Sequence, residues 1–167
     1  MEGEFQLKIW KIIFNVGVIA AVGGVLWTAK KVIDKSSNLE SRFRNYYEVL
    51  NQWVKNKNQH IEIVEYFKEN DIKNIAIYGM GELGNRLYEE LRTSDINIAY
   101  FIDKNAAEIY SGANDIPVVG LDEISQRDDV DAIIVTPIYD FDKIEEELIN
   151  QGIDLDIISL EDIIYAL

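Results

Sequence analysis

A glycine loop between a predicted strand and a predicted helix constrains the fold of this chain more than any other feature. The loop comprises Gly79, Met80, Gly81, Glu82, Leu83 and Gly84, and it follows the apolar run 74–78. Leucines at 83, 87 and 91 come next, at the four-residue spacing of one helix face. A strand, a G-x-G-x-x-G loop and a helix in this order are typical of the phosphate-binding turn in parallel α/β folds.

Short apolar runs alternate with helical stretches over the rest of the chain. The expected strands are 74–78, 97–102, 117–120, 131–136 and 154–159, and helices are expected near 83–91, over 141–151 and from Leu160 onward. Strands that alternate with helices form parallel sheets with helices on both faces. Residues 71–167 are therefore predicted to be an α/β domain, a small doubly wound parallel sheet of about five strands that is Rossmann-like.

The loop also predicts a ligand site. Gly79 would permit the tight turn, Gly81 would let the backbone approach a pyrophosphate, and Gly84 would allow close helix packing. The helix N-terminus would attract phosphate. Asp103 lies 24 residues after Gly79, where a carboxylate can bind ribose hydroxyls and repel a 2′-phosphate, which favours NAD over NADP. The predicted cofactor-binding residues are Gly79, Met80, Gly81, Glu82, Leu83, Gly84, Asp103 and Lys104. The alternative is a loop kept for packing that binds nothing.

The N-terminal part contains an uncharged run, residues 12–29. As a helix it would extend about 27 Å, close to the thickness of a hydrocarbon core. Trp10 and Trp27 bracket it, as interfacial aromatic residues do. A signal peptide and a buried soluble helix are the alternatives. The predicted organisation is a flank (1–11), a transmembrane helix (12–29), a juxtamembrane helical linker (30–70) and the α/β domain (71–167).

Basic residues predict the orientation of that span. Seven Lys and Arg residues lie between Thr28 and His60, whereas the N-terminal flank has only Lys8 and Lys11. By the positive-inside rule, the C-terminal domain is expected in the cytoplasm and the chain in the inner membrane as a single-pass protein.

The linker carries an apolar stripe. Residues 36–38 (Ser-Ser-Asn) are predicted to break the helix and cap the next one. The stripe then follows at spacings of four and three, with Leu39, Phe43, Tyr46, Leu50 and Trp53. Two heptads are short for a coiled coil, so packing against the α/β domain is favoured, and self-association as a homo-oligomer stays open.

Composition excludes several classes of function. The 167 residues contain no cysteine and one histidine, His60, so no metal site or cysteine chemistry is expected. Residues 71–167 hold 6 Lys and Arg against 22 Asp and Glu, which makes nucleic-acid binding improbable. Tyr139 and Lys143 match the Tyr-x-x-x-Lys spacing of short-chain dehydrogenases, but no catalytic serine accompanies them. The match is interpreted as chance, and no catalytic residue is assigned.

Residues 77–84, 100–105, 116–120 and 130–137 together resemble a known module. It is the Rossmann-like, CoA-binding-like nucleotide domain near the N-terminus of membrane nucleotide-sugar dehydratases and epimerases and of priming sugar-phosphate transferases. It is also similar to the N-terminal domain of sugar acetyltransferases that bind UDP-sugars. The resemblance covers roughly residues 72–160 and implies binding of a nucleotide or nucleotide sugar in bacterial surface or capsular polysaccharide biosynthesis, in contact with an enzyme of that pathway.

No catalytic domain of that family follows the module within the sequence. The leading expectation is therefore a membrane-anchored, non-catalytic nucleotide-binding module. The alternative is a small NAD-dependent oxidoreductase or nucleotide-sugar epimerase that a partner chain completes.

Overall fold

The computed structural model describes the backbone of residues 2–106, 116–127 and 129–167. The side chains of residues 2–23, 25, 125 and 126 lie outside the description. The chain divides into two compact units, Met1–Arg44 and Asn45–Leu167. Each unit is described by itself below.

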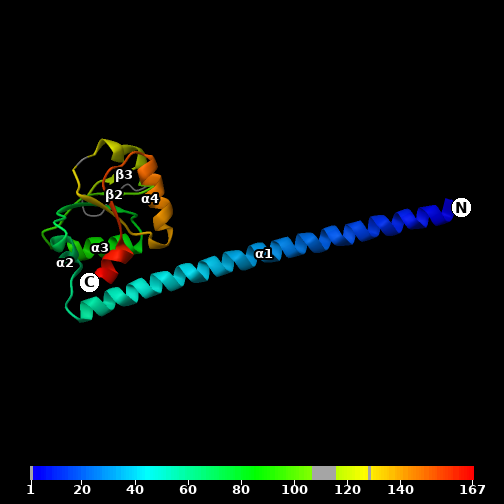
Figure 1. The fold of residues 1–167 in the computed structure, drawn as a ribbon, viewed down its shortest axis with the longest axis horizontal. Helices are drawn as coiled ribbons and strands as arrows, with labels where there is room; N and C mark the ends of the chain where they lie inside the picture. The colour runs from blue at the N-terminus through cyan, green and yellow to red at the C-terminus, as the bar shows by residue number, and fades with distance from the viewer. Residues whose placement is uncertain (1, 107–115, 128) are drawn as a thin grey trace. The chain divides into compact units, whose positions relative to one another are not determined.

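Helix α1 (Glu2–Asn58) is continuous, so the predicted break at residues 36–38 is wrong (Figure 1). No glycine or proline occurs between Gly24 and Gly79. Serine and asparagine disfavour a helix interior by only about 0.5 kcal/mol each relative to alanine, which is too little to end a long helix. The Ser41 hydroxyl donates to the Ser37 carbonyl, 3.0 Å away, within the helix. The predicted transmembrane and juxtamembrane helices are thus parts of one helix.

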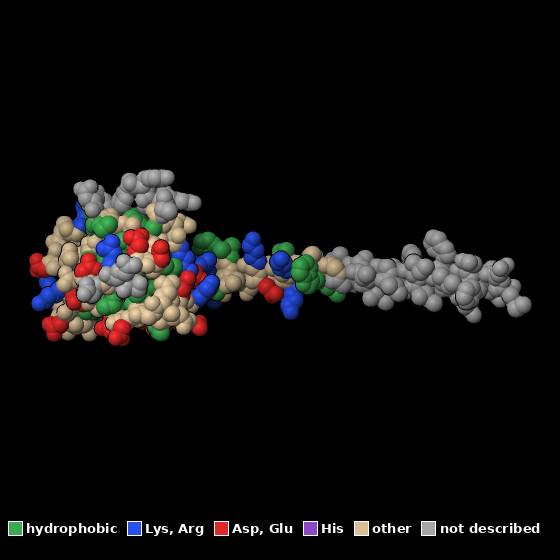
Figure 2. Space-filling view, turned by 90° about the horizontal axis from the view of Figure 1, so that it is seen from above, with side chains coloured by type: hydrophobic (Ala, Val, Ile, Leu, Met, Phe, Trp, Pro, Cys, Tyr) green, Lys and Arg blue, Asp and Glu red, His purple; other side chains and the backbone are tan. Residues whose placement is uncertain are grey.

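Within the described residues, none of the helices combines the length and apolarity needed to cross a membrane. Most of the predicted span 12–29 lies where side chains are not described. In the rest of the first unit, large apolar side chains of α1 are exposed, and hydrophobic groups follow this part of the helix in Figure 2. They are Leu26, Trp27, Val32, Ile33, Leu39 and Phe43. The membrane span stays a prediction.

The second unit is built on a five-stranded sheet in the order β3-β2-β1-β4-β5, with every neighbouring pair parallel. The strands are β1 (Asn74–Tyr78), β2 (Asn97–Ile102), β3 (Val118–Val119), β4 (Ala132–Val135) and β5 (Asp156–Ser159). Each lies within its predicted range. The parallel α/β sheet expected from the alternating apolar runs is confirmed.

Two hydrophobic clusters cover the two faces of the sheet. One contains the C-terminal end of α1 with α2 (Ile63–Glu69), α3 (Glu82–Leu91) and α5 (Leu160–Ala166). The other contains the 3-10 helix η2 (Leu121–Gln126) and α4 (Phe141–Asn150), which follows the short 3-10 helix η3 (Ile138–Asp140). Helices on both faces make the sheet doubly wound.

The end of α1 belongs to this unit, which begins at Asn45 rather than at residue 71. Val49 is fully buried and Trp53 is 7 % exposed, both in the cluster that contains α3. The Asn56 amide donates to the Ile164 carbonyl at 2.8 Å. Of the predicted stripe, Trp53 is buried and Tyr46 packs against the cluster, so packing against the α/β domain is confirmed for these two residues.

Glu90 on α3 joins α1 and the start of α2 to α3. Its carboxylate accepts hydrogen bonds from the Trp53 indole at 2.8 Å and from the Ile63 backbone N–H at 3.1 Å. It also pairs with the Lys57 ammonium at 2.7 Å. The α1 helix ends nearby, before His60, whose φ of 61° is in the left-handed region. His60 is exposed.

The burial of α1 predicts a difference between two valines of the same helix. Val49→Ala should lower the free energy of unfolding by about 2 kcal/mol, because it removes buried methyl groups from a packed core. Val54 is 57 % exposed, so Val54→Ala is the matched control and should change stability by less than about 0.5 kcal/mol. Equilibrium urea unfolding of the full chain measures both. If Val49→Ala lowers the free energy of unfolding as little as Val54→Ala does, this part of α1 does not belong to the packed domain.

Candidate ligand site

The candidate site lies at the carboxyl ends of β1 and β4, in the middle of the sheet. From β1 the chain passes through α3 to β2 on one side, whereas β4 and β5 lie on the other side. The loops that follow β1 and β4 therefore diverge. In open parallel sheets, such a topological switch point leaves a crevice where ligands bind.

Two of the three loop glycines are required by the fold. Gly79 has φ +95°, and a Cβ there would lie 3.0 Å from Pro137 and from the Thr136 hydroxyl. A Cβ on Gly84 would lie 2.1 Å from the Gly79 carbonyl oxygen, closer than any real contact. These positions need glycine for turn geometry and for close packing of α3 on the loop.

Gly81 differs from both. Its φ of −77° and ψ of −171° suit any residue, and a Cβ there would have nothing within 4 Å among the described atoms. Gly81 is exposed and is the N-cap of α3, whose N-terminus receives no side-chain cap. Packing thus gives no reason for glycine at this position, whereas close approach of a ligand to the backbone would.

Asp103 connects the end of β2 to the glycine loop. One carboxylate oxygen accepts the Met80 backbone N–H at 3.1 Å, and the other accepts the Asn105 N–H at 2.9 Å. The negative charge is thereby held in a fixed position beside the loop. The Met80 N–H is already used within the protein, so the N–H groups at the start of α3 are the ones open to an anion.

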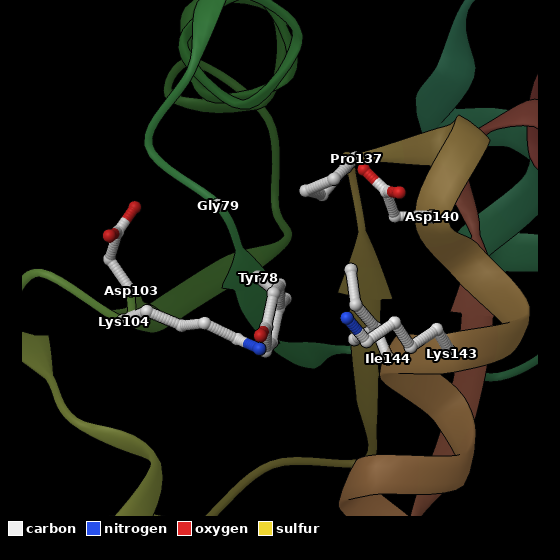
Figure 3. Close-up of a pocket in the computed structure, with 8 residues that line it drawn as sticks. All are labelled: Tyr78, Gly79, Asp103, Lys104, Pro137, Asp140, Lys143 and Ile144. Atoms are coloured by element: carbon white, nitrogen blue, oxygen red, sulfur yellow. The ribbon is translucent and has the colours of Figure 1, made fainter. Parts of the chain in front are cut away.

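A cavity of about 310 Å³ opens beside the loop, toward α4 (Figure 3). Strands β1 and β2 with the loops after them supply four of its residues, and the segment after β4 supplies four more. They are Tyr78, Gly79, Asp103, Lys104, Pro137, Asp140, Lys143 and Ile144.

Tyr78 lines this cavity, and its hydroxyl is buried beneath the cavity surface. Its side chain is 4 % exposed, and the hydroxyl has no hydrogen-bond partner in the part of the chain that is described. Burial, followed by the nearby Glu147 and Asp103 carboxylates, raises the pKa of Tyr78 to about 12. The hydroxyl therefore stays protonated at neutral pH and can donate a hydrogen bond to a ligand.

Two lysines also line the cavity. The Lys104 ammonium pairs with Glu147 at 2.6 Å, and both side chains are partly exposed. Lys143 on α4 has no described acidic group within ion-pairing distance. Residues 71–167 hold six Lys and Arg in all, so two of six converge on one cavity in a strongly acidic segment. Asp103 and Asp140 line the same cavity, so the two lysines offer local contacts for an anionic group rather than an excess of positive charge.

The structure brings three of the eight predicted binding residues to the cavity: Gly79, Asp103 and Lys104. Leu83 and Gly84 are buried in the core, and Met80 packs against it. The Glu82 side chain is exposed and lies 3.6 Å from Arg86. Sequence reasoning missed Tyr78, Pro137, Asp140 and Ile144, although their place after β1 and β4 was a usable signal.

The Tyr-x-x-x-Lys match is divided between two environments. Lys143 lines the cavity, whereas Tyr139 is 38 % exposed on η3 and is not among the lining residues. The tyrosine beside Lys143 in the cavity is Tyr78. No group of three or more potential metal-ligating side chains occurs in the described segments.

These features define a parallel α/β domain with a cavity at its switch point that two lysines and two aspartates line. The chain belongs to the C2185-like, N-terminal family, whose model matches residues 71–159. All eight cavity residues lie within the matched segment. No curated protein matches the chain.

The loop geometry predicts that the same substitution destabilises the domain much more at Gly84 than at Gly81. Gly84→Ala should lower the free energy of unfolding by about 1–3 kcal/mol or more, since its Cβ would overlap the Gly79 carbonyl. Gly81→Ala, the matched control, has open space and should lose less than about 1 kcal/mol, mainly from the weaker N-cap. Thermal unfolding of the two variants makes the comparison. A Gly84→Ala variant as stable as the wild type would contradict the close packing of α3.

Proposed function

We propose that the cavity, together with the start of α3 beside it, binds a nucleotide, a nucleotide sugar or NAD, and that the chain is a non-catalytic binding module. The observation that carries this proposal is Gly81, a glycine that the fold itself does not require. It stands at the uncapped N-terminus of α3, where phosphate is favoured. Asp103 lies beside it, held by two backbone N–H groups, and remains able to accept ribose hydroxyls.

Binding without catalysis is supported by the groups at the cavity. General acid–base catalysis is most efficient when the pKa of the group lies near the working pH. The pKa of Tyr78 is about 12, and the chain's single histidine lies outside the cavity. An NAD-dependent oxidoreductase or epimerase completed by a partner chain is the alternative function.

The cellular setting is proposed from the sequence. The uncharged run 12–29 would anchor α1 in lipid, and the basic residues after it would keep the domain in the cytoplasm of a bacterium. The resemblance to nucleotide-sugar modules suggests a role in surface or capsular polysaccharide biosynthesis beside an enzyme of that pathway.

Ligand binding is tested by calorimetry on the full chain in detergent with NAD, NADP, UDP-sugars and CoA. Gly81→Val should abolish binding, because the side chain would fill the space needed by phosphate, while the unfolding temperature without ligand stays close to that of the wild type. Asp103→Asn should weaken binding by about 1.5–3 kcal/mol, the range for a hydrogen bond to a charged group.

Unchanged affinity in both variants would contradict ligand binding at the loop and would indicate that its glycines serve only packing. Turnover of NAD with any sugar nucleotide, followed by absorbance of the reduced cofactor, would favour the oxidoreductase instead.

Membrane topology is tested with single cysteines, because the natural sequence has none. Glu69→Cys and Asn150→Cys place thiols at exposed positions of the second unit. The chain should sediment with membranes, and an impermeant thiol reagent should label these cysteines only after the cells are permeabilised. Labelling in intact cells would reverse the proposed orientation.

A further inference from the structure

From the glycine loop, the cavity extends toward the face of the sheet that α4 covers, opposite the face that α3 covers. Leu83 and Leu87 of α3 lie in the cluster on one face, whereas Tyr78 and Ile144 lie in the cluster on the other. A ligand with its phosphate at the start of α3 would therefore extend across the carboxyl ends of the strands, so that its other end lies near α4. The groups on that side decide what the other end can be.

Those groups include the Tyr78 hydroxyl and two lysines, and Asp140 adds a carboxylate to the same lining. Figure 3 shows the side chains of Lys104 and Lys143 extending toward each other across the cavity, with the Tyr78 hydroxyl between β1 and α4. The Tyr78 hydroxyl has no acceptor among the described groups. Lys104 gives one of its three N–H groups to Glu147, and Lys143 gives none to a described carboxylate.

The described protein groups do not satisfy the Tyr78 hydroxyl. A buried hydroxyl without an acceptor is unfavourable, because it has lost water and gained nothing. Its contact with a ligand requires a neighbouring side chain to shift. Lys104 can shift readily, since an ion pair between partly exposed side chains contributes little to stability.

We propose that this side of the cavity binds an anionic group of the ligand through Tyr78, Lys104 and Lys143. The inference rests on the proposed function and narrows its ligand class. The ligand is a nucleotide derivative with a carboxylate or phosphate on the part beyond its diphosphate, such as an acidic nucleotide sugar. Lys104 is shared between the anion and Glu147, and the Glu147 and Asp140 carboxylates oppose the anion. Lys143, which pairs with no described carboxylate, therefore supplies the positive charge that is not shared.

Two pairs of probes, each differing by one carboxylate, test this inference on the full chain in detergent. They are UDP-glucose with UDP-glucuronate, and NAD with deamido-NAD, in which a carboxylate replaces the carboxamide. In the pair that binds, the acidic member should bind about ten- to a hundredfold more tightly, the range for a charge-assisted hydrogen bond. Lys143→Met and Tyr78→Phe should each remove most of that preference.

Tyr100→Phe is the matched control. The Tyr100 hydroxyl is also buried without a described partner, but Tyr100 does not line the cavity. This variant should keep the preference. Removal of an unpartnered hydroxyl should not destabilise either tyrosine variant, and the exposed Lys143 can be replaced without affecting the core.

The outcomes separate the two proposals. Equal affinities within the pair that binds, or a preference that survives Lys143→Met, would overturn the anionic subsite and leave nucleotide binding standing. If no member of either pair binds the wild-type chain, both this inference and the proposed function fail.

Discussion

The close packing of α3 on the first turn of the glycine loop is the contact on which the rest of the domain depends. Gly84 lies directly against the Gly79 carbonyl, where no other side chain fits. The Thr136 hydroxyl donates to the carbonyls of Tyr78 and Gly79, at 2.9 and 3.2 Å, from the neighbouring strand end. These contacts fix the loop between β1 and β4. The position of the cavity, the start of α3 and the place of Tyr78 all follow from this arrangement.

The contacts of Glu90 are a second constraint, because they hold α1 and α2 against α3. One carboxylate holds an indole, an ammonium and a backbone N–H from segments that precede the sheet. Those groups lie before residue 71, where the family match begins. Val49 and Phe67 also precede residue 71, and both are fully buried in the hydrophobic core. The segment that matches the family therefore does not contain the whole core.

Local patterns predicted most of the fold. Continuous apolar runs marked all five strands, and the position of Asp103 at the end of β2 followed from strand length. The predicted break at residues 36–38 is wrong because Ser and Asn disfavour a helix only weakly, and this part of the chain contains no Gly or Pro that would end the helix. Tyr78 was read as part of a buried strand. Its lack of a hydroxyl partner depends on what packs around it, which local sequence does not specify.

The Tyr78 hydroxyl, which has no partner among the described residues, has a consequence for how such a domain would evolve. With phenylalanine at this position the folded state would be at least as stable, so selection for stability by itself would not retain the hydroxyl. Related sequences that keep tyrosine here would be under selection for the ligand, and those that have lost the ligand would drift to phenylalanine. This single position would then serve as a marker that separates binding members of the family from purely structural ones.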